Sequence, residues 1–193
     1  MLNKKCKTKC RIRGNRKRCG GKGGENVKRD KYDIVVEHIL DHQAKSYRIA
    51  YSYVSEKEAA LDIVQNAICR ALENYRNLRN VEAVQSWYYR ILVNEAIQYI
   101  RKQKREISCE PQNMKEEVYV EHAYEPGEEV YRKVCELPEQ MKTVVMLHYF
   151  EQMTLKEIAE VTGANVNTVK TRLYTALKRL RTMVEIEDGK ENG

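Results

Sequence analysis

The segment from Asn165 to Met183 carries side chains suited to DNA binding, and its apolar residues recur at helical spacing. The apolar side must pack inward, which leaves amides, hydroxyls and cations facing outward, with no carboxylate in the segment. Such groups bond base edges and phosphates in a major groove. A simply solvated helix face would more often carry Glu, so the pattern favours DNA recognition. The predicted DNA-facing residues are Asn167, Thr168, Lys170, Thr171, Arg172, Tyr174, Thr175, Lys178 and Arg179.

The residues just before this helix predict a second helix, which would position the first one on DNA. Thr154, with Glu157 three positions on, matches a capping box that begins a helix through Val161. Gly163 then turns the chain into the helix that starts at Asn165. Two helices joined by a short turn that contains glycine have the helix-turn-helix layout. Residues 128–184 are therefore predicted to form a small domain of four short helices.

Residues 32–105 form a second block with helical spacing almost throughout. Ser55, with Glu58, is a plausible cap for a helix that runs to about Tyr75. One side of this helix is an apolar core stripe. The other side is a polar stripe, which is either solvated or receives a partner. The polar stripe consists of Asp62, Gln65, Asn66, Cys69 and Glu73.

A loop is predicted after this helix, because residues 74–80 are rich in Asn and Arg. A second long helix should follow from about Val81 to Gln103, with Trp87 among the residues of its apolar side. Its C-terminal end is basic, which suits either the helix dipole or a phosphate backbone.

Composition indicates a helical protein, because only 9 Gly and 3 Pro occur in 193 residues. The sequence has no run of 18 apolar residues and no apolar stretch after its basic start, so we expect a cytoplasmic protein. Positive charge is concentrated in residues 1–31, with 13 Lys or Arg and two acids, whereas the remainder holds 22 Lys or Arg and 26 acids. Residues 106–127 are acidic and irregular, and we interpret them as a flexible linker between the two blocks.

The first 31 residues are predicted to be a disordered basic leader. It could strengthen DNA binding by counterion release, or hold a metal weakly through Cys6, Cys10 and Cys19. A third interpretation comes from the genetic code, because residues 22–27 can be encoded by a ribosome-binding sequence followed by a GUG start codon. Residues 1–26 would then not be translated in the natural protein.

Catalytic and metal chemistry find little support in the sequence. The six cysteines lack paired CxxC spacing, and free thiols are the expected state in a reducing compartment. The four histidines are scattered, and no phosphate loop or nucleophile motif occurs. We therefore expect no enzyme activity, no metal and no cofactor. Residues 185–193 are expected to be a tail.

Four strings in order carry a specific resemblance, at residues 60–72, 86–105, 137–163 and 165–181. Together they resemble the sigma-70 family, and within it the extracytoplasmic-function (ECF) class, which keeps only domains two and four. The resemblance implies an all-α protein, with a region 2 helical bundle at 32–105 and a region 4 helix-turn-helix at 128–184. Residues 47–54 and 167–178 most resemble SigV-like factors, with which Gram-positive bacteria answer cell-envelope attack.

The resemblance also implies roles for individual residues. It assigns binding of the RNA polymerase clamp helices to Asp62, Gln65, Asn66 and Glu73, and −35 recognition to the outward face of the last helix. A flipped base of the −10 element would need polar groups and a stacking surface, although the ring of Trp87 fits the core better. The residues that the resemblance assigns to −10 DNA are Arg76, Asn77, Arg79, Asn80, Ser86, Trp87, Arg90, Asn94, Gln98, Arg101 and Lys102.

The function that the resemblance implies is promoter recognition for core RNA polymerase, with melting of the −10 element. The expected partners are the clamp helices and flap of polymerase, promoter DNA and a membrane-bound anti-sigma factor. An alternative is an autonomous dimeric helix-turn-helix regulator, which would bind a two-fold symmetric DNA site tightly without polymerase.

Overall fold

The computed structural model describes residues 30–107 and 128–191, and every regular element in these two ranges is helical. The predicted all-α class is confirmed. Of the predicted leader at 1–31, residues 1–29 lie outside the described residues, and Lys31 is already the first residue of a helix. All but the start of the predicted linker also lies outside the described residues. Along the part of the chain that is described, no helix is both long and apolar enough to cross a bilayer.

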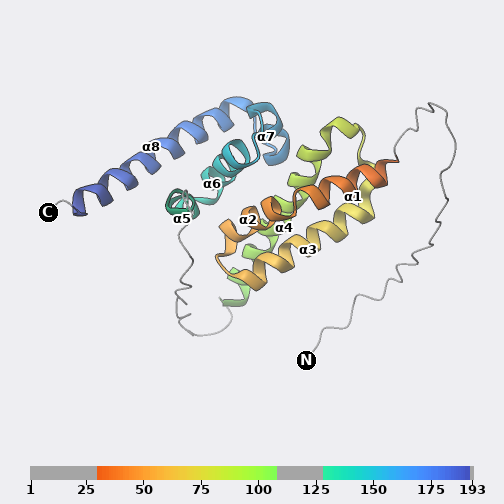
Figure 1. Ribbon diagram of the computed structural model, residues 1–193, viewed down its shortest axis with the longest axis horizontal. Coiled ribbons are helices and arrows are strands. Elements are labelled where there is room, and N and C mark those ends of the chain that lie inside the picture. The colour runs from red at the N-terminus through yellow and green to blue at the C-terminus, as the bar shows by residue number, and fades with distance from the viewer. Residues whose placement is uncertain (1–29, 108–127, 192–193) are drawn as a thin grey trace, which may run out of the picture.

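The N-terminal domain consists of α1 (Lys31–Asp41), α2 (Gln43–Val54), α3 (Lys57–Asn74) and α4 (Val84–Ile107), which pack on one another (Figure 1). Two short 3-10 turns, η1 (Tyr75–Asn77) and η2 (Val81–Ala83), connect α3 to α4. The core side of α3 follows the predicted spacing and is formed mostly by small residues, which lets α2 and α4 approach closely. The buried residues of α3 are Ala59, Ala60, Ile63, Val64, Ala67 and Ala71.

The start of α3 differs from the prediction. Ser55 has a left-handed backbone, with φ of 53°, and ends α2 instead of capping α3. Glu56 occupies the N-cap position of α3 without a side-chain hydrogen bond. The predicted Ser55–Glu58 capping box is therefore wrong, because the chain needs Ser55 for the turn between the two helices.

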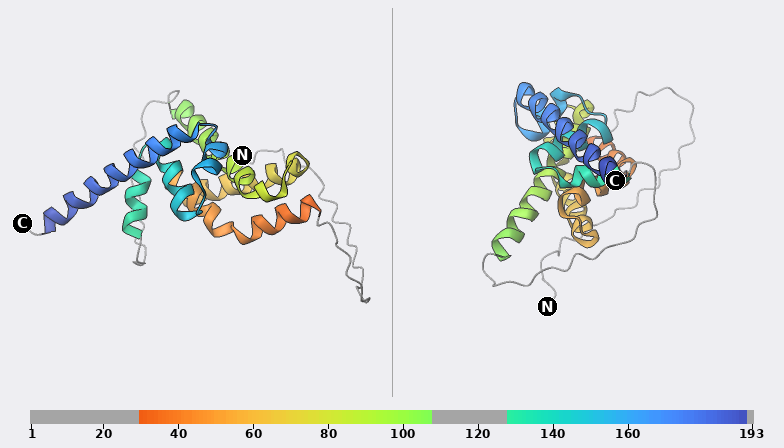
Figure 2. Two further views of the ribbon diagram at one scale, coloured as in Figure 1. Left: turned by 90° about the horizontal axis from the view of Figure 1, so that it is seen from above. Right: turned by 90° about the vertical axis from the view of Figure 1, so that its left-hand side faces the viewer.

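The C-terminal domain consists of α5 (Glu128–Glu136), α6 (Glu139–Val145), the π-helical turn η3 (Met146–Phe150), α7 (Leu155–Thr162) and α8 (Val166–Glu191). The Thr154–Glu157 capping box is present, and Gly163 ends α7 with φ of 67°, as predicted. Helix α8 extends past the rest of the molecule (Figure 1, Figure 2). It continues to Glu191, so most of the predicted tail at 185–193 belongs to this helix.

The two domains pack against each other. Helix α7 lies on α4, and α5 contacts α2. The buried apolar residues of both domains form one continuous cluster. Polar bonds also cross between the domains: Lys142 donates to the Ser52 carbonyl at 2.5 Å, and the Tyr131 hydroxyl donates to the Arg48 carbonyl at 2.6 Å. The sequence suggested two modules on a tether and gave no indication of this direct contact.

Candidate nucleic-acid interface

The outward face of α8 presents the predicted polar residues. Asn165 caps the helix, because its side-chain oxygen accepts from the Thr168 backbone N–H at 2.7 Å. Lys170 lies over the ring of Tyr174, 6.0 Å from its centroid, and Tyr174 is 63% exposed. This face therefore offers cations, hydroxyls and an aromatic ring, and residues 165–183 contain no carboxylate. Its exposed members are Asn167, Lys170, Thr171, Tyr174, Lys178 and Arg179, with Thr168 and Thr175 half-buried at its border.

Burial along α8 does not follow the apolar residues throughout. Val166, at the start of the helix, is 40% exposed, whereas Ala176 is fully buried. Arg172 is half-buried and lines a shallow pocket with residues at the start of α6, including Pro138 and Glu139. Arg172 thus lies on the side of α8 that faces α6, away from the centre of the predicted DNA face.

A pocket of about 350 Å³ between α3 and α4 brings together many of the residues predicted to contact −10 DNA. Arg90, Asn94 and Gln98 come from one face of α4, and Asn77 comes from η1. Trp87 is half-buried, so its ring both packs on the core, as the sequence suggested, and contributes to the pocket wall. The predicted residues that line this α3–α4 pocket are Asn77, Trp87, Arg90, Asn94 and Gln98.

The pocket also contains residues that the sequence did not identify as part of a site: Arg70, Asn74, Ile91 and Glu95. Arg70 and Asn74 are one turn apart near the end of α3, and Ile91 and Glu95 are one turn apart on α4. Helical spacing places each pair on one face. Only the packing of α3 on α4 brings the two pairs together.

Other predicted −10 residues lie outside the pocket. The Arg76 guanidinium packs over the ring of Tyr75, and Asn80 caps η2 by accepting from the Glu82 backbone N–H. Arg79 is exposed on the connection between the two turns, and Arg101 and Lys102 are exposed farther along α4. These residues lie on both sides of the pocket along the chain: in the connection that precedes α4, and near the C-terminal end of α4.

Ser86 lies elsewhere. Its side chain is buried beneath α7 and donates to the Ala83 carbonyl at 3.2 Å and to the Glu160 carboxylate at 3.3 Å. Ser86 is 7% exposed, so DNA cannot reach it in this arrangement of the two domains. The sequence could not anticipate this, because Glu160 is 74 residues away along the chain.

The polar stripe on α3 is exposed as predicted. Asp62, Gln65, Asn66 and Glu73 are all exposed, and Leu61 beside them is 41% exposed. An accessible row of polar groups with one exposed apolar side chain can receive a protein partner.

Two family models match the chain in order. The model described as Sigma-70 region 2 matches residues 38–106, and that described as Sigma-70, region 4 matches residues 127–180. Together the matches cover more than half of the chain and correspond to the two helical domains.

The chain belongs to the sigma-70 family.

Relatives place this sigma factor in the ECF class. It is 41% identical over 155 residues to RNA polymerase sigma factor SigV of Bacillus subtilis, and the match covers 80% of this chain and 93% of SigV. It is 28% identical to ECF RNA polymerase sigma factor SigW of the same organism, over 81% of this chain and 92% of SigW. These matches confirm the predicted SigV-like resemblance.

Solved structures agree on the fold. The sigma factor RpoE, in complex with the anti-sigma factor NepR from Bartonella quintana, has a TM-score of 0.69 and 19% identity, and the match covers 78% of this chain and 96% of RpoE. CnrH, in complex with the cytosolic domain of CnrY, has a TM-score of 0.58 and 18% identity, and the match covers 79% of this chain and 88% of CnrH. At these identities the similarity concerns the fold alone.

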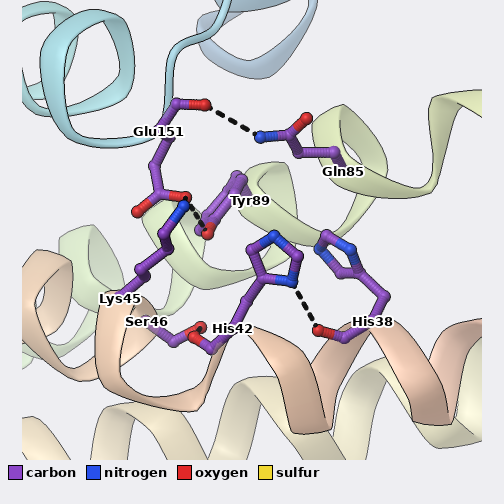
Figure 3. Close-up of polar contacts among 7 residues, drawn as sticks. All are labelled: His38, His42, Lys45, Ser46, Gln85, Tyr89 and Glu151. Atoms are coloured by element: carbon purple, nitrogen blue, oxygen red, sulfur yellow. Dashed lines mark hydrogen bonds and ion pairs between the residues drawn. The ribbon is translucent and has the colours of Figure 1, made fainter.

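The contact between the two sigma domains contains a buried carboxylate (Figure 3). Glu151 follows η3 and is 3% exposed. Its carboxylate accepts from the Tyr89 hydroxyl and lies 3.8 Å from the Lys45 ammonium. Its backbone carbonyl accepts from the Gln85 side chain at 3.0 Å. Burial raises the pKa of Glu151, and burial together with the Glu151 hydrogen bond raises the pKa of Tyr89. Region 4 thus places one carboxylate among donors from α2 and α4.

Two of the four histidines, His38 and His42, lie beside this cluster (Figure 3). The rings of His38 and His42 stack with centroids 4.1 Å apart, and the edges of Tyr88 and Tyr89 meet His38. Burial, and next the nearby His42, lower the pKa of His38 to about 4. His38 is therefore neutral at physiological pH and acts as part of the core.

Proposed function

We propose that this ECF sigma factor directs core RNA polymerase to specific promoters and helps to melt the −10 element, without catalytic chemistry of its own. Region 2, at residues 32–105, would bind polymerase and −10 DNA, and region 4, at residues 128–184, would bind the −35 element. The observation that carries this proposal is the presence on one chain of two separate polar surfaces, the outward face of α8 and the α3–α4 pocket, which both contain cations and amides. Relatives over most of the chain are named as RNA polymerase sigma factors.

Tethering explains how two small domains could recognise one promoter. Each domain presents only a few base-facing groups, so each should bind DNA weakly alone. When polymerase holds both domains at the correct separation, the second contact becomes nearly intramolecular and total affinity rises. Free protein should therefore bind promoters poorly.

The packed arrangement must change before region 2 can use all of its predicted DNA contacts. Ser86 lies under α7 and bonds Glu160, so its contact with DNA requires α7 to move away from α4. We expect polymerase to supply the energy for this separation, because it binds the two domains at different places. Because it would act with polymerase, the protein would work in the cytoplasm.

The exposed α3 stripe is the proposed polymerase contact. Replacing Asp62 by Arg reverses one charge on an exposed surface and should leave the fold intact. We expect Asp62→Arg to weaken association with core polymerase, measured by co-purification. Asp33→Arg, an equal charge change on exposed α1, is the control. Normal association of Asp62→Arg would remove this stripe from the site.

We also propose an anti-sigma factor, bound to the membrane, as the partner that holds this sigma factor inactive until cell-envelope stress. Of two proteins of the same fold, RpoE was solved with the anti-sigma factor NepR, and CnrH was solved with the cytosolic domain of CnrY. The polymerase-binding face is the surface that such a partner would cover. Cell fractionation before and after envelope damage tests this proposal. We expect the sigma factor to move from the membrane fraction to the soluble fraction after the damage.

The decisive experiment is run-off transcription with purified core polymerase on the DNA upstream of the gene itself. We expect specific transcripts only when both sigma factor and core are present. The alternative, a dimeric helix-turn-helix regulator, predicts saturation of a palindromic site at nanomolar concentration by the chain alone. That result, together with no binding to core, would exclude the sigma function.

A further inference from the structure

Glu151 of region 4 is held by donors that belong to region 2 (Figure 3). The Tyr89 hydroxyl on α4 donates to its carboxylate, and the Lys45 ammonium on α2 lies 3.8 Å from the same oxygen, Oε2. The Gln85 side chain, one turn before Tyr89 on α4, donates to the Glu151 backbone carbonyl at 3.0 Å. Lys45, Gln85 and Tyr89 thus form a site of three donors on region 2, the anion site, which region 4 fills in the packed arrangement.

The surroundings of the anion site favour a negative charge. Burial raises the pKa of Glu151, and the Tyr89 hydrogen bond is the first of the effects that oppose this rise. The other opposing effects come from basic side chains, in the order Lys45, His42 and Arg48. The Lys45 side chain is 47% exposed and Arg48 is exposed, so both cations can meet an anion that arrives from solvent.

The Glu151 carboxylate fits the anion site incompletely. Its second oxygen, Oε1, is buried without a hydrogen-bond partner among the described residues. A buried acceptor without a donor opposes burial, so this contact is one that region 4 can give up. A backbone phosphate of a nucleic acid has the same single charge and two free acceptor oxygens, and it accepts from Lys, Tyr and Gln side chains.

The anion site lies next to residues predicted to contact −10 DNA. Gln85 directly precedes Ser86 and Trp87 on α4, and Tyr89 follows them within one turn. Region 4 covers Ser86 through Glu160 and covers the anion site in the same contact. Separation of the two domains therefore exposes Ser86 and the anion site together. A strand that reached the start of α4 would bring its phosphates near these donors.

We propose that the anion site binds one backbone phosphate of the melted −10 strand in the holoenzyme, and that Glu151 takes the place of this phosphate in the free chain. The inference rests on the proposed function, in which that strand reaches the start of α4. Lys45 pairs with the phosphate charge, and Gln85 and Tyr89 donate to its oxygens. Phosphate binding and domain packing exclude each other here, because one set of donors cannot hold both anions.

The first test is binding of holoenzyme to premelted promoter DNA in which each −10 phosphate is replaced in turn by an uncharged methylphosphonate. We expect wild-type holoenzyme to lose about tenfold in affinity at one linkage, because one charged hydrogen-bonded contact is lost. Lys45→Ala should bind unmodified DNA more weakly and lose little more at that linkage, because the partner of the phosphate is already absent. Lys57→Ala, at an exposed lysine of α3, is the matched control and should keep the wild-type loss.

The second test uses the free full-length chain and a fluorescent single-stranded oligonucleotide with the −10 sequence of the cognate promoter. Glu151→Gln removes the internal anion and should tighten binding by about fivefold, because the anion site becomes available. The gain should disappear when Lys45→Ala is added to Glu151→Gln. Glu136→Gln makes the same charge change at an exposed residue of α5 and should bind as the wild type does.

The inference is overturned if no linkage distinguishes wild-type holoenzyme from Lys45→Ala. If Lys45→Ala in that case also binds core polymerase poorly, the site instead takes an acidic side chain of polymerase. A Glu151→Gln gain that survives Lys45→Ala overturns the inference as well, because opening would then only free other DNA-binding residues. All of these results leave the proposed function standing, since holoenzyme still binds the promoter. Wild-type holoenzyme that binds no promoter DNA would instead contradict the proposed function, and the inference with it.

Discussion

Lys170 offers the most direct test of the α8 face at the level of single residues. It is exposed, lies over Tyr174, and has no carboxylate in its helix segment to compete with DNA phosphate. We expect Lys170→Ala to lower transcription from the cognate promoter several-fold, because one phosphate or base contact is lost. Run-off transcription at moderate salt measures this effect.

Arg172 serves as an informative comparison with Lys170, because it faces α6 and is half-buried. Arg172→Ala should also reduce transcription, but less than Lys170→Ala does and with weaker dependence on salt. Full activity of both variants would contradict the assignment of −35 recognition to α8.

His38 makes the stability of the protein depend on pH. The folded state binds a proton on His38 only near pH 4, whereas the unfolded state binds one near the ordinary pKa of 6.5. The unfolded state therefore holds more protons between these values, and stability should fall as the pH is lowered from about 6.5 to 4. The raised pKa of Glu151 acts in the opposite direction, because the folded state keeps that proton to a higher pH.

The variant His38→Phe isolates the histidine contribution and retains a ring against Tyr88 and Tyr89. Over the same pH range, we expect it to lose up to about 3 kcal/mol less stability than the wild type. Urea unfolding at several pH values provides the measurement. Identical pH profiles for the two proteins would show that His38 is not held neutral by the fold.

At the level of elements, the capping box of α7 makes a separate prediction. The Thr154 hydroxyl and the Glu157 carboxylate satisfy backbone N–H groups at the start of α7. Thr154→Ala should reduce the free energy of unfolding by about 1 kcal/mol, because one N–H group loses its partner. Thr154→Ser keeps a hydroxyl and should cost much less, and urea denaturation compares the two variants. Equal losses would mean that the hydroxyl does not cap the helix.

Individual helices were largely predictable, and their exceptions have local causes. The spacing of Ile63, Val64 and Ala67 identified the buried side of α3, because a helix repeats every 3.6 residues. Ser55 was misassigned because Ser suits an N-cap, and nothing in the local sequence shows that the preceding helix ends there. The burial of Tyr89 on α4 was missed because region 4 covers that side of the helix.

For the whole molecule, the prediction concerns how strongly the contact between the two domains stabilises the fold. The Tyr89 hydroxyl donates to the buried Glu151 carboxylate across this contact. Tyr89→Phe removes the donor and leaves the carboxylate short of a partner, at a cost of about 1 to 3 kcal/mol. Amide hydrogen exchange should show faster exchange in α7 and the start of α4. Tyr32→Phe, at a 42% exposed ring in α1, is the control and should change neither measurement.

The sequence by itself determined the helical class, the order of the two domains, the capping of α7 and the face of α8 that carries cations and amides. These properties follow from spacing and residue type along a single helix, where side chains three or four positions apart are neighbours. Only the tertiary structure decided that Arg70 meets Glu95, that Ser86 is covered by α7, and that Glu151 is buried against Tyr89. Each pair joins residues from different helices, and their distance depends on how those helices pack, which no local pattern records.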